Sequence, residues 1–326
     1  LLDRSDLVFI DPVSTGYSRP APGEEAKQFH GYEQDIESVG DFIRLFTTRH
    51  NRWLSPKFII GESYGTTRAA GLSGYLQDRY GLALNGLMLI SSILTFQTAR
   101  FTTGNDLPPM LFLPTYTATA WYHGKLDAAL QADRDGAIQE AEEFALNEYN
   151  LALAKGASLS DEERAAIVGK LARLTGLSPA FVERSNLRIN IHRFVKELLR
   201  DQGRTVGRLD SRFKGIDRDG TGQETEHDPS HSAISGAYTG AFNDYVRREL
   251  KFENDMPYEI ISDLYESWDY SKHQNQFLDV AETLREAMSK NPFLKIFVAN
   301  GYYDLATPFF ATEYTFAHLG GDPGLR

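Results

Sequence analysis

The stretch "KFIIGESYGT", residues 57–66, constrains the fold of this chain more than any other part of the sequence. Its apolar half predicts a short buried strand, and residues 66–80 predict a helix. Gly61 and Gly65 have no Cβ, so the chain can turn sharply between strand and helix, with Ser63 in the turn. This arrangement is typical of a nucleophile elbow, which lifts a serine hydroxyl clear of a sheet. The alternative is a serine in an ordinary strand-to-helix loop.

A serine in such a turn needs partners before it can act as a nucleophile. The N-terminus of the following helix favours an oxyanion there, because its first N–H groups have no partners within the helix. A base must take the hydroxyl proton, and an acid must orient that base. In α/β-hydrolases these groups occur in the order serine, aspartate or glutamate, histidine. Asp304 fits the acid, since it follows an apolar strand expected at residues 294–299, and a helix N-cap is its alternative interpretation.

The histidines of the chain do not supply an obvious base. Eight are present, and only His318 follows Asp304, 14 residues later. His318 lies in an apparent helix, whereas the triad usually requires a further helix and strand before its histidine. We interpret His318 as a surface or helix-end residue, and we expect the base to lie outside this chain. His192 is expected within a helix, and His227 and His231 in an acidic loop.

The first third of the chain alternates predicted strands and helices. Residues 6–10 and 84–92 predict two further strands, and apolar residues from Tyr32 to Phe46 repeat at helical spacing. Alternation of this kind predicts an α/β fold with a mainly parallel sheet that helices cover on both faces.

From about residue 112 the sequence becomes helical and has no convincing strand. Ser160 and Glu163 have the spacing of a capping box, and residues 178–200 continue with apolar positions at helical spacing. The predicted parts are an α/β-hydrolase core in residues 1–111, a helical cap insertion in residues 112–275 and a return of the core in residues 276–326.

Composition excludes several classes of site and partner. The net charge of −11 argues against a nucleic-acid partner, and no stretch approaches the ~20 apolar residues that span a membrane. The absence of cysteine excludes disulfides, thiolate metal sites and a cysteine nucleophile. The acidic segment 217–228 has part of a calcium-loop pattern but has Thr221 and Asp228 at positions five and twelve, so we interpret it as a solvated loop. We predict no metal and no cofactor.

Three blocks of the sequence, in this order, resemble the serine carboxypeptidases, the cathepsin A or carboxypeptidase C family, and in particular their cysteine-free bacterial branch. "LVFIDPVSTGYSRP" is similar to the family's first strand and loop. "IIGESYGT" matches its serine motif, including the flanking glutamate and tyrosine, and "FVANGYYDLATP" resembles its Gly-x-x-Asp turn. The Glu-Ser-Tyr triplet is much more specific than the Gly-x-Ser-x-Gly frame alone.

The resemblance implies an α/β-hydrolase fold with a helical cap, and the removal of C-terminal residues from peptides through an acyl-enzyme. It assigns Ser63 as nucleophile, Asp304 as triad acid and the N–H of Tyr64 as an oxyanion donor. It also implies that Glu62 helps to bind the free carboxylate of the substrate by sharing a proton with it, which favours acidic pH. The alternative for Glu62 is an ion pair with a cation such as Arg68.

The chain also departs from the family pattern. Ser14 replaces a common glycine, and neither the Asn-Gly-Gly-Pro-Gly loop nor the Gly-His loop that supplies the base is present. The sequence begins without methionine, so we expect a piece of a longer protein that is inactive or nearly so by itself. By resemblance, an exported location is expected. An esterase or acyltransferase of the same fold, and a catalytically dead binding protein, remain alternative functions.

Overall fold

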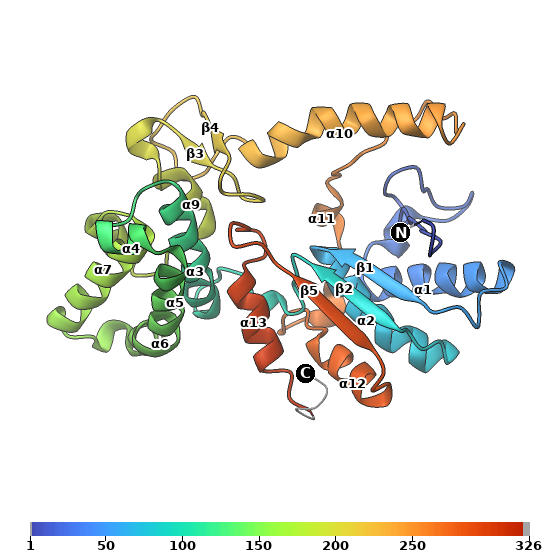
Figure 1. Ribbon diagram of the computed structural model, residues 1–326, viewed down its shortest axis with the longest axis horizontal. Helices are drawn as coiled ribbons and strands as arrows, with labels where there is room; N and C mark the ends of the chain where they lie inside the picture. Colours follow the sequence, from blue (N-terminus) through green and yellow to red (C-terminus); the bar gives the residue numbers. More distant parts are fainter. Residues whose placement is uncertain (1, 322–326) are drawn as a thin grey trace.

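The sheet of the computed structural model, which describes residues 2–321, has three parallel strands. They are β1 (Phe58–Glu62), β2 (Gly86–Ile90) and β5 (Lys295–Ala299), in the spatial order β1-β2-β5 (Figure 1). Glu62, Ile90 and Ala299 stand in register, so the three strands end at the same edge of the sheet. The chain is therefore of mixed α/β class with a small parallel sheet, as the alternation of elements predicted.

Three helices pack on one face of this sheet. They are α1 (Tyr32–Arg49), α2 (Tyr64–Tyr80) and α12 (Ala281–Lys290) (Figure 1). Leu87 and Leu89 of β2 face this layer and are buried with Leu72 and Leu76 of α2. The predictions of a helix after residue 32 and of a helix after the serine turn are confirmed.

The opposite face of the sheet has apolar side chains that solvent reaches. Phe58, Ile60 and Phe297 are 58%, 60% and 58% exposed, and they alternate with the buried positions along their strands. The prediction that helices cover both faces is wrong for the described part of the chain. The reason is the path of the chain: after β2 it enters the helical part and returns through α12, on the face that is already covered.

The strand expected at residues 6–10 does not form. The segment is extended but pairs with none of the described strands, and Phe9 is 90% exposed. An ion pair between Asp6 and Arg52, with Oδ2 2.6 Å from Nη2, holds it near the end of α1. An apolar run becomes a strand only where a neighbouring strand supplies its hydrogen bonds, and β1 has no such partner on this side.

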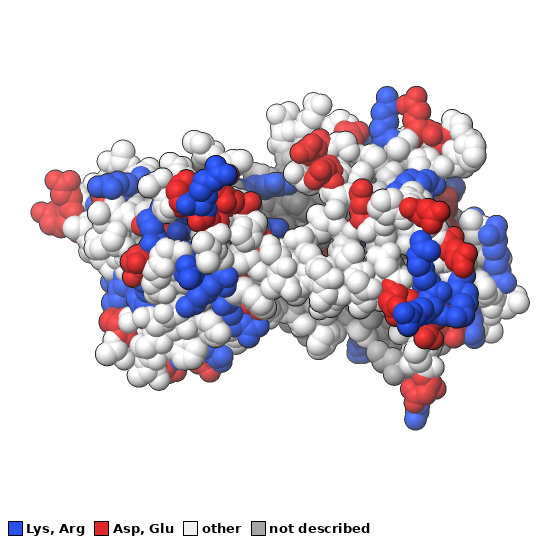
Figure 2. Space-filling view, turned by 90° about the horizontal axis from the view of Figure 1, so that it is seen from above, with Lys and Arg blue, Asp and Glu red and all other residues white. Residues whose placement is uncertain are grey.

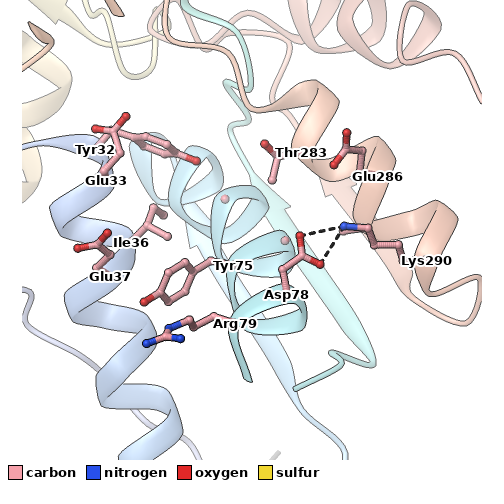
Figure 3. Close-up of a pocket in the computed structure, with 13 residues that line it drawn as sticks. Tyr32, Glu33, Ile36, Glu37, Tyr75, Asp78, Arg79, Thr283, Glu286 and Lys290 are labelled. Carbon is pink, nitrogen blue, oxygen red and sulfur yellow. Dashed lines mark hydrogen bonds and ion pairs between the residues drawn. The ribbon is translucent and has the colours of Figure 1, made fainter. Parts of the chain in front are cut away.

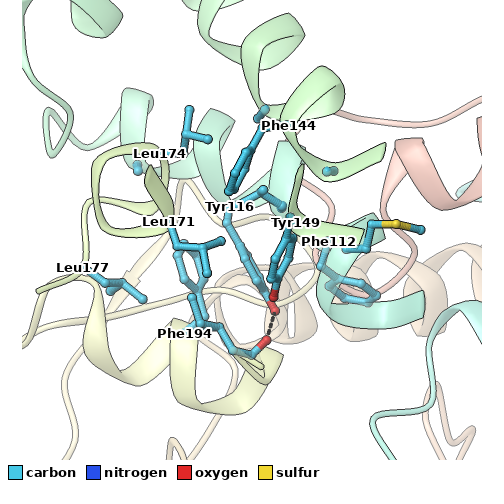
Figure 4. Packing of buried hydrophobic residues seen from close by; sticks show 14 of the residues in the cluster. Phe112, Tyr116, Phe144, Tyr149, Leu171, Leu174, Leu177 and Phe194 are labelled. Atoms are coloured by element: carbon cyan, nitrogen blue, oxygen red, sulfur yellow. Dashed lines mark hydrogen bonds between the residues drawn. The ribbon is translucent and has the colours of Figure 1, made fainter. Parts of the chain in front are cut away.

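The second part of the molecule is helical and is built around α3 (Leu107–Tyr122), which is buried from Pro108 to Ala120. Tyr116 of α3 stacks on Phe194, with ring centroids 4.1 Å apart, at the centre of this core (Figure 4). The other α-helices are α4 (Ala128–Ala132), α5 (Arg134–Phe144), α6 (Asn150–Lys155), α7 (Asp161–Thr175), α8 (Pro179–Arg184), α9 (Ile191–Glu197), α10 (Pro229–Arg248), α11 (Leu264–Ser267) and α13 (Phe309–Ala317). Short helical turns are η1 (Ala26–Phe29), η2 (Phe96–Thr98), η3 (Ala145–Tyr149), η4 (Gly156–Ser158), η5 (Arg200–Gln202) and η6 (Ser271–His273).

The helical part confirms one local prediction and corrects two. The capping box of Ser160 and Glu163 is present at the start of α7. The continuous helical pattern of residues 178–200 is interrupted between α8 and α9, where Leu187 has a φ of 62°. Two short antiparallel strands also occur where none was expected, β3 (Thr205–Val206) and β4 (Lys214–Gly215). Both deviations come from tertiary contacts, since strands of two residues have no sequence signal of their own.

The apolar residues form two separate clusters. One joins the sheet to α1, α2 and α12, and the other fills the helical part. Phe309 and Phe310 of α13 belong to the second cluster, although they follow β5 in sequence. The division at residues 111/112 and 275/276 stays a prediction, and residues 322–326 of its last part lie outside the described residues.

Candidate active site

Ser63 occupies a sharp turn between β1 and α2. Its backbone has φ 53° and ψ −121°, a conformation that glycine adopts more easily than serine. A Cβ on Gly61 would lie 2.0 Å from the carbonyl oxygen of Gly65, so the close approach of strand and helix requires glycine at position 61. A Cβ on Gly65 would meet none of the described atoms within 4 Å. Both glycines were expected to permit the sharp turn, but only Gly61 is required for the close packing of strand and helix.

The backbone around Ser63 is fixed by hydrogen bonds. The N–H of Ser63 donates to the carbonyl of Ile90 in β2 at 3.0 Å, and its carbonyl accepts from the N–H and the hydroxyl of Thr66 at 2.9 and 2.7 Å. The Ser63 side chain makes no capping bond to α2. Tyr64 is the first residue of α2, where an N–H has no carbonyl of its own helix to bind. This geometry leaves the Tyr64 N–H available to an anion at the turn.

Asp304 lies in the loop that follows β5. Its Oδ1 accepts hydrogen bonds from the N–H groups of Ala306 and Thr307 at 2.8 and 3.0 Å, and its Oδ2 accepts from the Thr307 hydroxyl at 2.8 Å. The side chain is only 9% exposed. Asp304 is not the N-cap of α13, which is Pro308, so the capping interpretation applies only to the turn itself.

The turns that carry Ser63 and Asp304 border the same cavity. Both follow strands that end at one edge of the parallel sheet, with β2 between them. A cavity of about 530 Å³ opens there, lined by Ser63 and by Leu305, Ala306 and Thr307 of the acid loop. The carboxyl edge of a parallel sheet is the place where open α/β folds bind their ligands.

Glu62 precedes Ser63 at the end of β1, and its carboxyl is partly buried although the residue as a whole is exposed to solvent. Partial burial raises the pKa of its carboxyl, and the negative charge of Asp304 raises it further. Arg68 does not pair with Glu62: its Nε lies 2.7 Å from Oδ2 of the buried Asp35. The alternative ion pair of Glu62 with Arg68 is therefore wrong, and Glu62 has an environment that favours its protonated form.

The wall of the cavity on the side of the helical part was not foreseen from the sequence. His192, Arg208, Trp268 and Tyr270 line it, together with Arg100 from the loop after β2. The sequence offered no signal for this set, because its members come from four separate segments that meet only in the tertiary structure. Among the described residues, His192 makes no hydrogen bond with Ser63, so it is a lining residue only.

The other candidates lie away from this cavity. His318 follows the last residue of α13, where its Nδ1 lies 2.7 Å from the carbonyl oxygen of Tyr314, in agreement with a helix-end residue. Asp217 of the acidic segment pairs with Lys196, Oδ2 to Nζ 2.5 Å, and within residues 2–321 no cluster of three acidic or histidine side chains could hold a metal. Most of residues 217–228 are exposed, as predicted for a solvated loop, but the Asp217 side chain is buried, which the sequence did not predict.

A second cavity of the same volume lies between α1, α2 and α12 (Figure 3). Glu33, Glu37 and Glu286 surround it, and Asp78 forms an ion pair with Lys290 at its rim, Oδ1 to Nζ 2.8 Å. Serine and histidine are absent from its described lining. It therefore lacks the nucleophile chemistry of the Ser63 cavity.

In the first loop, Ser14 occupies the position where the family commonly has glycine. Ser14 has a φ of 70°, in the left-handed region that favours glycine. Asp11 organises the same loop: its Oδ2 accepts from the N–H of Tyr17 at 3.1 Å, and its Oδ1 from the hydroxyl of Tyr258 at 2.8 Å. The loop thus keeps a glycine-type conformation with serine at this position.

Figure 2 shows basic and acidic side chains at both ends of the face seen from above, with a mostly uncharged middle. Within the described chain, every helix is too short or too polar to cross a bilayer.

The comparison with known proteins identifies the family of the chain. The sequence model of the serine carboxypeptidase family matches residues 3–322. No match was found among curated proteins or among solved structures. Since the family match extends over nearly the whole chain, the protein belongs to the serine carboxypeptidases, hydrolases that act on peptides.

Proposed function

We propose that the protein hydrolyses the last peptide bond of peptides with a free C-terminus, with Ser63 as nucleophile. The observation that supports this most is the placement of Ser63 in a strained turn that opens into the cavity bordered by the Asp304 loop. The three-stranded sheet with α1, α2 and α12 would be part of an α/β-hydrolase core. The helical part, residues 112–275, would be its cap.

The proposed reaction has two steps. The Ser63 Oγ attacks the carbonyl carbon of the last peptide bond, and the amine of the C-terminal residue leaves with a proton. The oxyanion that forms on the carbonyl oxygen accepts a hydrogen bond from the N–H of Tyr64. Water then hydrolyses the Ser63 ester and releases the shortened peptide. A histidine base takes and returns the proton, and Asp304 orients it.

Glu62 is proposed to recognise the free carboxylate of the substrate. Its raised pKa makes the protonated carboxyl available at higher pH than usual for glutamate. A protonated Glu62 can donate a hydrogen bond to the carboxylate of the peptide, whereas an ionised one repels it. This role separates a carboxypeptidase from an esterase or acyltransferase, whose substrates have no free carboxylate at this place.

The direct test is release of the C-terminal amino acid by the full-length protein from N-blocked dipeptides, from about pH 4 to about pH 8. We expect release that is strongest at acidic pH, measured by chromatography of the free amino acid. The same peptides with a C-terminal amide, and simple N-acyl amino acid esters, are assayed in parallel. Turnover of esters without release from peptides would favour the esterase or acyltransferase, and inactivity on both would favour the binding protein.

Replacing Glu62 by glutamine is expected to flatten the pH dependence of peptide binding. In the native protein, the protonated fraction of Glu62 falls as the pH rises through its raised pKa, so affinity for a free carboxylate falls as well. Glutamine can donate its N–H at every pH, so the variant loses this dependence. Fluorescence titration with an N-dansyl dipeptide measures the effect, and the amidated dipeptide is the control. An unchanged pH profile in Glu62→Gln would contradict the assignment.

A further inference from the structure

The Ser63 cavity has two arginines that are not paired with an acidic side chain. The guanidinium of Arg100 lies over the ring of Phe96, 5.4 Å from its centroid, and makes no ion pair within residues 2–321. The guanidinium of Arg208 has neither an ion pair nor a hydrogen bond among the described residues. Arg68, in the same lining, is different because Asp35 neutralises it. Two positive charges are therefore free to interact with whatever enters the cavity.

The main chain at Arg208 is held against the acid loop. Its carbonyl accepts a hydrogen bond from the N–H of Leu305, the residue after Asp304, at 3.0 Å. Its own N–H donates to Oδ1 of Asp228, at the start of α10, at 3.2 Å. The guanidinium is thus carried by a backbone that is fixed from both sides next to the catalytic loop.

Arg100 comes from a different part of the chain and is also held locally. Its N–H donates to the carbonyl of Phe96 at 3.1 Å, and its carbonyl accepts from the Asn105 side chain at 2.8 Å. The loop after β2 and the segment before α10 thus each contribute one exposed arginine to the lining of a single cavity. This coincidence is notable in a chain whose net charge is −11.

Guanidinium groups bind carboxylates through paired, charge-assisted hydrogen bonds. An unpaired arginine at the wall of a substrate cavity is therefore suited to an anionic group of the substrate. The aromatic residues Phe96, Phe112 and Trp268 of the same lining can pack on the aliphatic part of a side chain that carries this group.

We propose that Arg100 and Arg208 bind an acidic side chain of the substrate, so that the cavity beside Ser63 prefers peptides with glutamate or aspartate in the last or penultimate position. This inference rests on the proposed peptidase function. It concerns a second carboxylate, distinct from the terminal one that Glu62 recognises. An acidic side chain in the last or in the penultimate position would present the same group, a carboxylate. Pairs of peptides that differ only at one of these positions distinguish them.

The test measures binding, so that it does not depend on turnover. The Ser63→Ala protein is titrated with four N-dansyl dipeptides at neutral pH: Ala-Glu, Ala-Gln, Glu-Ala and Gln-Ala. Glutamine has the shape of glutamate without its charge, so each pair isolates the contribution of the carboxylate. We expect about tenfold tighter binding of the glutamate peptide in one pair, and the pair that shows it identifies the position.

Arg100→Gln and Arg208→Gln are each expected to reduce this preference severalfold, and the double variant to remove it. Arg204→Gln is the matched control, because it removes the same charge four residues before Arg208 and lies outside the cavity lining. Equal affinity for both members of each pair, or a preference that survives the double substitution, would overturn the proposal. Glutamate-selective binding without hydrolysis by the native protein would instead contradict the peptidase function and still support the carboxylate site.

Discussion

In the full-length protein, replacing Ser63 by alanine is expected to lower kcat/KM for N-blocked dipeptides by about 10⁴- to 10⁶-fold. Without the Oγ no acyl-enzyme can form, and only the oxyanion donor and substrate binding contribute to the remaining rate. Ser289→Ala, on the exposed side of α12, is the control and should retain full activity. Activity of Ser63→Ala within tenfold of the native protein would show that another residue is the nucleophile.

The same position should be a site of stored strain. A serine with φ 53° and ψ −121° costs about 1–3 kcal/mol, whereas glycine tolerates these angles and loses about 0.5–1 kcal/mol through the greater freedom of the unfolded chain. Ser63→Gly is therefore expected to be inactive but about 1 kcal/mol more stable than the native protein in urea unfolding. Lost activity with increased stability is the signature of a strained catalytic residue, and a less stable glycine variant would argue against strain at the turn.

Replacing Asp217 by asparagine is expected to lower the free energy of unfolding by about 3–5 kcal/mol. Its Oδ2 lies 2.5 Å from Nζ of Lys196, and the two side chains are only 2% and 4% exposed. The substitution leaves the Lys196 ammonium buried with the carbonyl of Asp219, at 2.8 Å, as its remaining partner. Urea denaturation measures the change.

The exposed pair of Asp78 and Lys290 provides the control for this prediction. Its side chains are 57% and 47% exposed, so Asp78→Asn should cost less than about 1 kcal/mol. The double variant Lys196→Met with Asp217→Leu should cost less than either single substitution at that pair, because no unpaired charge stays buried. A double variant as unstable as the sum of the two single ones would mean that the pair is not coupled.

Local sequence patterns predicted the elements with strong short-range signals. The strand, turn and helix around Ser63 needed only an apolar run, glycines and a helical continuation. All three formed where expected, but the prediction that the strand is buried is wrong, because Phe58 and Ile60 are exposed. The capping box at Ser160 and the turn of Asp304 were equally readable, because their hydrogen bonds join residues three apart or less. The resemblance to the family also singled out Glu62, Ser63 and Tyr64 as candidate site residues, since these three form a contiguous motif.

Patterns failed where a partner distant in sequence decides the outcome. Residues 6–10 have the composition of a strand, but no described neighbour supplies its hydrogen bonds. The segment 217–228 was predicted to be a solvated loop, yet its Asp217 carboxylate is buried in an ion pair with Lys196 of α9. Coverage of the sheet depended on the path of the chain after β2, which periodicity does not record.

By itself, the sequence determined which groups meet at the serine turn: Ser63, the N–H of Tyr64 and the carboxyl of Glu62 are adjacent in the chain, so their proximity needs no folding. Only the tertiary structure decided what surrounds them. It brought the Asp304 loop to the same sheet edge, raised the pKa of Glu62 through burial and the Asp304 charge, and placed Arg100 and Arg208 in one cavity. The physical reason is that burial and electrostatic interactions depend on distance in space, and residues 100, 208 and 304 become neighbours only when the sheet and the helical part pack together.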